Sequence, residues 1–124
     1  MKRGEVWEAT LLPRSGSEQQ GTRPVILLMR ENFLSAESWR SILVVPLTTS
    51  TAQGRRGPTS VLLSAGVGGL TRDSFALAHQ YTTLDRSKIT RKLGELPATE
   101  LLAVEQAVIL AAGITWALNP ESVR

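Results

Sequence analysis

The chain has 124 residues, 42% of them hydrophobic and 20% charged, which is the size and composition of one ordinary globular domain spanning residues 1–124. It contains no cysteine, which excludes disulfides, thiolate metal sites and a cysteine nucleophile. Fourteen lysines and arginines against eleven acidic residues give a net charge of +3, and this basic, arginine-rich balance permits a nucleic acid partner.

The first half of the chain predicts short strands separated by polar loops. Apolar runs or alternation predict strands over 4–12, 24–29 and 41–48. Residues 14–22 carry two glycines and no apolar side chain, which predicts a loop, and 32–40 are expected to form a turn or a short helix. Pro46 lies within the third strand and predicts a bulge or an edge position, since proline cannot donate to a ladder.

The second half predicts further strands and then one helix. A polar loop over 49–59 is followed by expected strands over 61–63, 74–80, 81–84 and 92–96, with turns at 66–69 and 85–88. After Pro97, apolar residues recur at helical spacing. Since no charge occurs from 107 to 118, we expect this helix to pack against the sheet on one face and a second subunit on the other. The order predicts a mostly β, α+β fold: a small barrel with a C-terminal helix.

No metal, cofactor or membrane segment is predicted. One histidine and two aspartates cannot supply a routine zinc site. The glycine-rich turn 66–69 lacks the Lys-Ser/Thr ending of a phosphate loop. No stretch is apolar enough to span a bilayer, and Glu5 and Glu8 lie where a signal peptide requires an apolar run. We therefore expect a cytoplasmic protein.

Seven short motifs occur along the chain in a distinctive order. They are Arg3-Gly-Glu-Val-Trp7, Gly16-Ser-Glu-Gln19, Arg23-Pro-Val25, Val45-Pro-Leu-Thr48, Gly69-Leu-Thr-Arg-Asp-Ser74, Thr83-Leu-Asp85 shortly after Gln80, and Lys92-Leu-Gly-Glu-Leu96. In this order the chain resembles the MazF/PemK (Kid-like) family of bacterial toxin endoribonucleases over residues 2–118. The resemblance implies an SH3-like barrel of the CcdB/Kid type, a homodimer, a single-stranded RNA substrate and a cognate antitoxin.

The resemblance also implies that the RNA is cleaved without a metal and that the fragments carry 2′,3′-cyclic phosphate and 5′-hydroxyl ends. Cleavage of RNA is expected to inhibit translation and growth. It assigns the family's catalytic pair to Arg23 and Thr48. A guanidinium can clamp the charge that develops on the phosphate, and a threonine hydroxyl can orient that phosphate. His79 stands where some members carry an acidic residue, which makes its imidazole a candidate general base.

Sequence readout is expected from polar side chains in the two loops, because single-stranded RNA is read on the edges of splayed bases. The expected RNA-binding residues are Glu18, Gln19, Thr49, Ser50, Arg55, Arg56 and Gln80. Of these, Arg55 and Arg56 suit phosphates rather than bases.

Two alternative functions stay open at this point. The first is a gyrase poison of the CcdB type; Gly113-Ile-Thr-Trp116 contains the residues of that group's Trp-Gly-Ile motif in a different order. The second is a family member that binds RNA or antitoxin without cutting. Thr82 keeps this second reading open, since it stands where many members have arginine.

Overall fold

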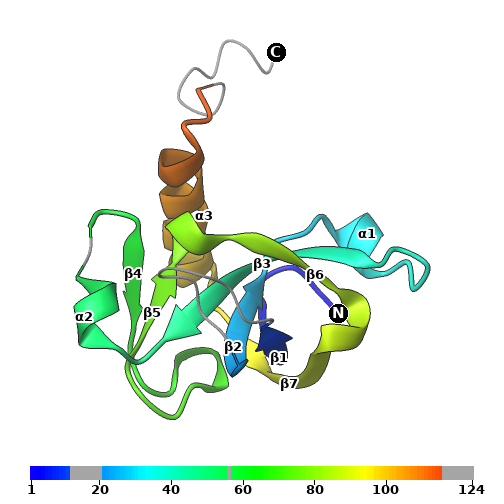
Figure 1. Cartoon of the computed structure of the whole chain (residues 1–124), viewed down its shortest axis with the longest axis horizontal. Helices are drawn as coiled ribbons and strands as arrows, with labels where there is room; N and C mark the ends of the chain where they lie inside the picture. Colours follow the sequence, from blue (N-terminus) through cyan, green and yellow to red (C-terminus); the bar gives the residue numbers. More distant parts are fainter. Residues whose placement is uncertain (12–20, 56, 116–124) are drawn as a thin grey trace.

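The computed structural model describes residues 1–11, 21–55 and 57–115 of the chain (Figure 1). The strands are β1 (Glu5–Leu11), β2 (Gly21–Leu27), β3 (Ser41–Thr48), β4 (Ser60–Leu63), β5 (Ser74–Leu77), β6 (Thr82–Asp85) and β7 (Ile89–Glu95). The α-helices are α1 (Glu31–Leu34), α2 (Thr51–Gly54) and α3 (Ala98–Ala112). Single 3-10 turns are η1 (Val67–Gly69), η2 (Ala78–Gln80) and η3 (Arg86–Lys88).

The strands form one antiparallel sheet in the order β4-β5-β3-β2-β1-β7, and β6 also pairs with β3. The predicted mostly β fold with a C-terminal helix is therefore confirmed. The sheet is open in the described part of the chain, because its end strands β4 and β7 do not pair with each other. Instead, η1 packs against β7 so closely that a Cβ on Gly69 would lie 2.0 Å from the carbonyl oxygen of Leu93. Gly69 of η1 and Gly94 of β7 have no side chains, so the two backbones can approach closely and the open sheet curves into a barrel-like shape.

Pro46 lies in the central strand, so the prediction of an edge position is wrong. One side of β3 pairs with β2, and the other pairs with β6 up to Val44 and with β5 from Leu47. The N–H of Leu28 donates to the carbonyl of Leu43, so odd positions of β3 direct their backbone groups to β2 and the nitrogen of Pro46 faces the other side. There the ladder is interrupted by η2, and no donor is required.

Two apolar clusters lie on the two faces of the sheet. One contains Val6, Ile26, Val45 and Leu47 and is covered by α3 through Val104, Leu101 and Val108. The other is lined by β1, β2, β3 and β6 and contains Leu34 of α1. The later turns of α3 extend beyond the sheet (Figure 1) and end at Gly113, which has a left-handed φ of 71°. No described helix is long and apolar enough to cross a membrane.

Several predicted boundaries need correction. The strand expected over 74–80 stops at Leu77, although the N–H of Ala78 makes one more bond in register with the β4–β5 ladder, to the carbonyl of Thr59. The chain then crosses through η2 to β6. The loop expected over 49–59 contains the helix α2, and Gly21 and Thr22 belong to β2 rather than to a loop. Most of the predicted loop 14–22 and the end of the predicted apolar helix lie outside the described residues.

Candidate active site

Arg23 lies on a part of β2 that is paired with β1 alone. It stands opposite Ala9 in the β1–β2 ladder, whereas the β2–β3 ladder stops at the pair Val25–Pro46. Even positions of this segment direct their backbone groups to β3, and Pro24 has no N–H to donate there. Pro24 therefore ends the pairing with β3. Arg23 remains exposed beside the separating strands, and its guanidinium makes a local bond of 3.3 Å to the carbonyl of Thr22.

Thr48 is the last residue of β3 and is 8% exposed. Its hydroxyl oxygen accepts the N–H of Ser50 at 3.1 Å. The Ser50 hydroxyl in turn accepts the N–H of Gln53 at 3.3 Å and caps α2. This chain of hydrogen bonds orients the Thr48 side chain and leaves its O–H group able to donate.

The register brings Arg23 and Thr48 together. Each lies two residues beyond the last β2–β3 pair, Val25–Pro46, on its own strand. Side chains alternate across a sheet, so Arg23 points to the same face as Val25, and Thr48 to the same face as Val44; both of those valines belong to one apolar cluster. Both residues lie where the two strands separate, just beyond that last pair. The guanidinium of Arg23 and the hydroxyl of Thr48 thus share one face of the sheet, and both can donate hydrogen bonds to a phosphate.

His79 and Gln80 lie on η2, not on a strand as predicted. The Nδ1 atom of His79 is 2.9 Å from the hydroxyl oxygen of Thr59, whose carbonyl also accepts the N–H of Ala78. Two hydrogen bonds to Thr59 therefore fix the position of η2 and orient the exposed imidazole of His79. Gln80 is half-buried.

The other predicted RNA-binding residues do not form one group. Thr49 points to the opposite face from Thr48, since the two are consecutive at the end of a strand. Ser50 is half-buried and serves as the cap of α2, whereas Arg55 is exposed at the other end of that helix. Glu18, Gln19 and Arg56 lie outside the described residues.

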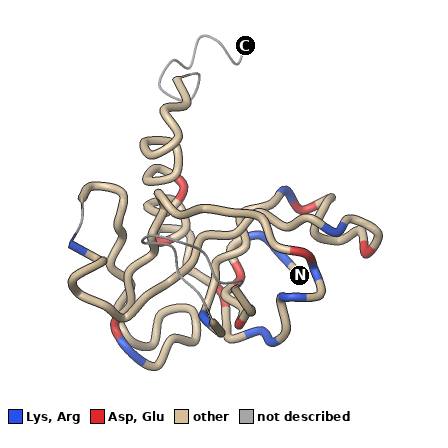
Figure 2. Tube along the Cα trace, viewed as in Figure 1, with Lys and Arg blue, Asp and Glu red and all other residues tan. Residues whose placement is uncertain are grey.

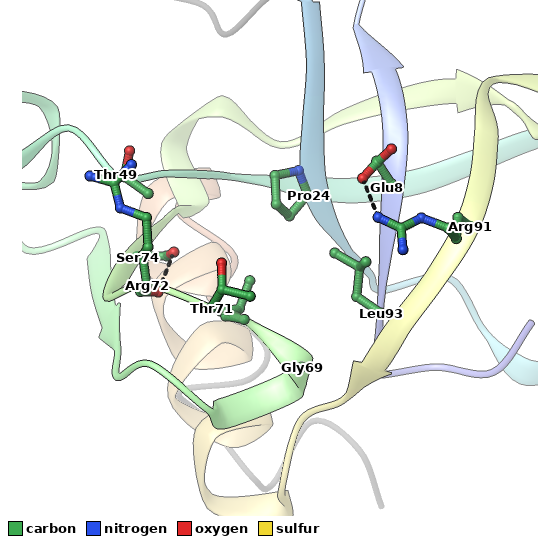
Figure 3. A pocket seen from close by; sticks show the side chains of 10 residues that line it. Glu8, Pro24, Thr49, Gly69, Thr71, Arg72, Ser74, Arg91 and Leu93 are labelled. Atoms are coloured by element: carbon green, nitrogen blue, oxygen red, sulfur yellow. Dashed lines mark hydrogen bonds and ion pairs between the residues drawn. The ribbon is translucent and has the colours of Figure 1, made fainter.

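A pocket of about 210 Å³ opens next to the pair and was not predicted from the sequence (Figure 3). Residues from the η1–β5 connection line one side, and residues of β1, β2 and β7 line the other. The motif Gly69–Ser74 supported the family resemblance, but its Arg72 was given no role. The only signal that sequence reasoning could have used was this arginine in a segment rich in turn residues.

A buried carboxylate orders the start of the chain near this site. Glu5 is 3% exposed and accepts hydrogen bonds from the N–H of Lys2, from Nε1 of Trp7 at 2.9 Å and from Nζ of Lys92 at 2.8 Å. Burial raises the pKa of the Glu5 carboxyl, but the Lys92, Trp7 and Lys2 donors together outweigh it, so the pKa lies below its ordinary value. The same pair raises the pKa of Lys92. No group of three potential metal-ligating His, Asp or Glu residues occurs within the described ranges.

The fold and the site define a class: a small antiparallel β protein with a C-terminal helix and an arginine–hydroxyl pair where two strands part. The sequence model of the PemK-like, MazF-like toxins of type II toxin–antitoxin systems matches residues 2–111. The chain belongs to this family, as its motifs predicted.

Two relatives are similar along almost their whole length. The endoribonuclease MazF9 of Mycobacterium tuberculosis is 34% identical over 113 residues, which cover 89% of this chain and 94% of the relative. The endoribonuclease MazF of Staphylococcus saprophyticus is 30% identical over 114 residues, 92% of each chain.

Solved structures agree with the fold. A crystal structure of MazF from Deinococcus radiodurans has a TM-score of 0.74 and 25% identity, covering 92% of this chain and 97% of the other. A MazE–MazF structure from the same organism has a TM-score of 0.69 and 25% identity, covering 92% and 96%.

Proposed function

We propose that this chain cuts single-stranded RNA at short specific sequences through attack of a ribose 2′-hydroxyl on the neighbouring phosphate, with no metal taking part. The chain is an endoribonuclease toxin of a toxin–antitoxin system: the family match covers most of it, and the relatives named above are endoribonucleases. The observation that carries the proposed chemistry is the placement of Arg23 and Thr48 on one face where β2 and β3 separate.

The reaction forms a bond between O2′ and phosphorus and breaks the bond between phosphorus and O5′. Negative charge grows on the nonbridging oxygens as the 2′-oxygen attacks. The guanidinium of Arg23 stabilises that charge, because its planar N–H groups can donate two charge-assisted hydrogen bonds to the nonbridging oxygens. The Thr48 hydroxyl donates to the same phosphate and holds it for in-line attack. The leaving O5′ takes a proton from water, so the products are a 2′,3′-cyclic phosphate and a 5′-hydroxyl.

His79 is the proposed general base for the 2′-hydroxyl. In this role Nδ1–H donates to the Thr59 hydroxyl, and the Nε2 lone pair accepts the proton from the 2′-hydroxyl. An imidazole is suited to this task because its ordinary pKa lies near neutral pH. Gln80 beside it, together with the loop residues Glu18, Gln19, Ser50, Arg55 and Arg56, is proposed to contact RNA.

Two protein partners follow from the family. A cognate antitoxin is proposed to cover the site, since MazE is paired with MazF in the Deinococcus radiodurans structure. A homodimer is proposed through α3. Leu102 and Leu110 of this helix are 53% and 58% exposed, and the helix carries no charge after Glu105 (Figure 2). We place this activity in the cytoplasm, where RNA is available.

The test is incubation of a long mixed-sequence RNA with the protein in EDTA, followed by analysis of the fragment ends. Discrete cuts with cyclic phosphate ends are expected, and Arg23→Ala should reduce the rate by at least about a hundredfold. Arg30→Ala removes the same charge from an exposed site at α1 and should cut normally. Intact RNA together with trapped gyrase–DNA complexes would instead identify a gyrase poison.

The role of His79 is tested by the pH dependence of kcat/KM. His79→Ala should abolish the rising limb of this profile, because that limb reports deprotonation of the base. An unchanged limb with a weaker KM would assign His79 to RNA binding alone.

A further inference from the structure

The pocket beside the catalytic pair arises because one strand ends between two that continue. β3 separates β2 from β5 as far as Thr48. Beyond that point Pro24 of β2 and Ser74 at the start of β5 face each other across the space that β3 has left, and Thr49 lies at its end (Figure 3). The pocket therefore opens on the opposite face of the sheet from Arg23 and Thr48, one residue away along each strand.

The walls of this pocket are apolar and its rims are polar. Pro24 and Leu93 form part of one side, and Thr71 on the η1–β5 connection points toward them (Figure 3). Arg91 on β7 is paired with Glu8 at 2.9 Å. Arg72 stands on the other rim, exposed, and no hydrogen bond or ion pair joins its guanidinium to any described residue.

We propose that this pocket receives the base of a nucleotide adjacent to the scissile phosphate, with Arg72 holding that nucleotide's phosphate. The inference rests on the proposed RNA cleavage. A volume of about 210 Å³ is large enough for one nucleobase. Apolar walls suit the faces of a base, and hydroxyls and a carboxylate at the rim suit its edges.

The position of the pocket also favours RNA over a segment of the antitoxin. Pro24 and Thr49, which line the pocket, directly follow the catalytic residues Arg23 and Thr48 in the chain. A strand whose phosphate lies between Arg23 and Thr48 has its next nucleotide within reach of the gap between β2 and β5. The guanidinium of Arg72, which has no partner among the described residues, matches a phosphate, which every nucleotide supplies.

Two variants test the proposal without touching the catalytic pair. Thr71→Trp fills the pocket from an exposed position, and Arg72→Ala removes the proposed phosphate contact. Ser38→Trp and Arg30→Ala make the same chemical changes at exposed sites next to α1 and serve as controls. Thermal melting of each variant establishes that it is folded before activity is compared.

The substrates are a cleaved RNA oligonucleotide and a set in which each nucleotide flanking the cut is replaced in turn by an abasic residue. For the unsubstituted protein one abasic position should lower kcat/KM by about tenfold or more. Thr71→Trp should lower kcat/KM to a similar extent on the intact oligonucleotide. In this variant the same abasic position should cause no further loss, because the tryptophan and the abasic substitution each remove the contact between the base and the pocket. Arg72→Ala should raise KM about tenfold with little change in kcat, which a general loss of structure would not do.

Three outcomes would overturn the proposal. In the first, Thr71→Trp cleaves every oligonucleotide like the unsubstituted protein. In the second, Thr71→Trp remains sensitive to each abasic position. In the third, it cleaves normally but escapes neutralisation by the antitoxin, which would make the antitoxin the occupant. If the unsubstituted protein cuts no RNA, the proposed function fails. The role of the pocket is then tested separately by binding of an uncleavable 2′-deoxy-substituted oligonucleotide. If Thr71→Trp binds this oligonucleotide as tightly as the unsubstituted protein does, the pocket does not receive a base.

Discussion

Replacing Gly94 with alanine tests the contact that brings the open sheet into a barrel-like shape. Gly94 lies on β7 opposite Val6 of β1, and η1 packs on its other side. A Cβ at this position would be 2.5 Å from the carbonyl carbon of Gly68 and 2.8 Å from the nitrogen of Gly69. These are backbone atoms, so no side-chain rotation can relieve the overlap.

The magnitude follows from the size of that overlap. Nonbonded carbons are at their optimum at about 3.5 Å or more, so η1 and β7 must separate by about 1 Å. Overpacking of this kind costs about 1–3 kcal/mol. Gly94 has an ordinary backbone conformation, unlike Gly68 and Gly69 with φ of 62° and 77°. Without the contact, alanine in a strand would be favourable by about 0.5–1 kcal/mol. Because only backbone atoms can move apart here, we take the upper end of the overpacking cost, which leaves a net loss of about 2 kcal/mol, or about 8 °C in Tm for a chain of this length.

Urea denaturation at one fixed protein concentration measures this loss as a lower midpoint at constant m. Gly66→Ala is the control: it lies in the same connection, has a φ of 95° and has no atom within 4 Å of the added Cβ. It should show only the strain of a left-handed alanine, about 1 kcal/mol. A Gly94→Ala variant as stable as the unsubstituted protein would refute the close contact between η1 and β7.

Two further perturbations test other parts of the structure. Glu5→Gln should lower the free energy of unfolding by about 2 kcal/mol at pH 7, since the carboxylate accepts from Trp7 and Lys92. Because the folded pKa of Glu5 is below its ordinary value of 4.5, this stabilisation is present above pH 4.5 and lost as the pH falls through the folded pKa, so the stabilities of the two proteins should converge with decreasing pH in urea titrations. Leu110→Glu should dissociate the proposed dimer in sedimentation experiments while Ser38→Glu leaves it intact; a dimeric Leu110→Glu protein would exclude that face of α3.

Local patterns in the sequence were sufficient for the elements themselves. Apolar runs bounded by polar and glycine-rich segments placed β3 at 41–48 with its observed bounds, and apolar spacing after Pro97 placed α3. These patterns work because burial on one face imposes a period on each element, whatever the partner is. They failed at Leu77, because the chain turns into η2 after Ala78, and the N–H of Tyr81 donates to the carbonyl of Ala78 instead of continuing a strand.

The sequence by itself identified Arg23 and Thr48 as polar residues at expected strand ends, although Arg23 lies within β2, and its ordered motifs predicted the toxin family. Tertiary structure alone decided that the two side chains share a face, because strand register depends on which strands pair. It also decided that Thr49 turns away into a pocket with Arg72, and that Gly68, Gly69 and Gly94 meet backbone to backbone. Such contacts join residues far apart in the chain, and no local propensity encodes the distance between them.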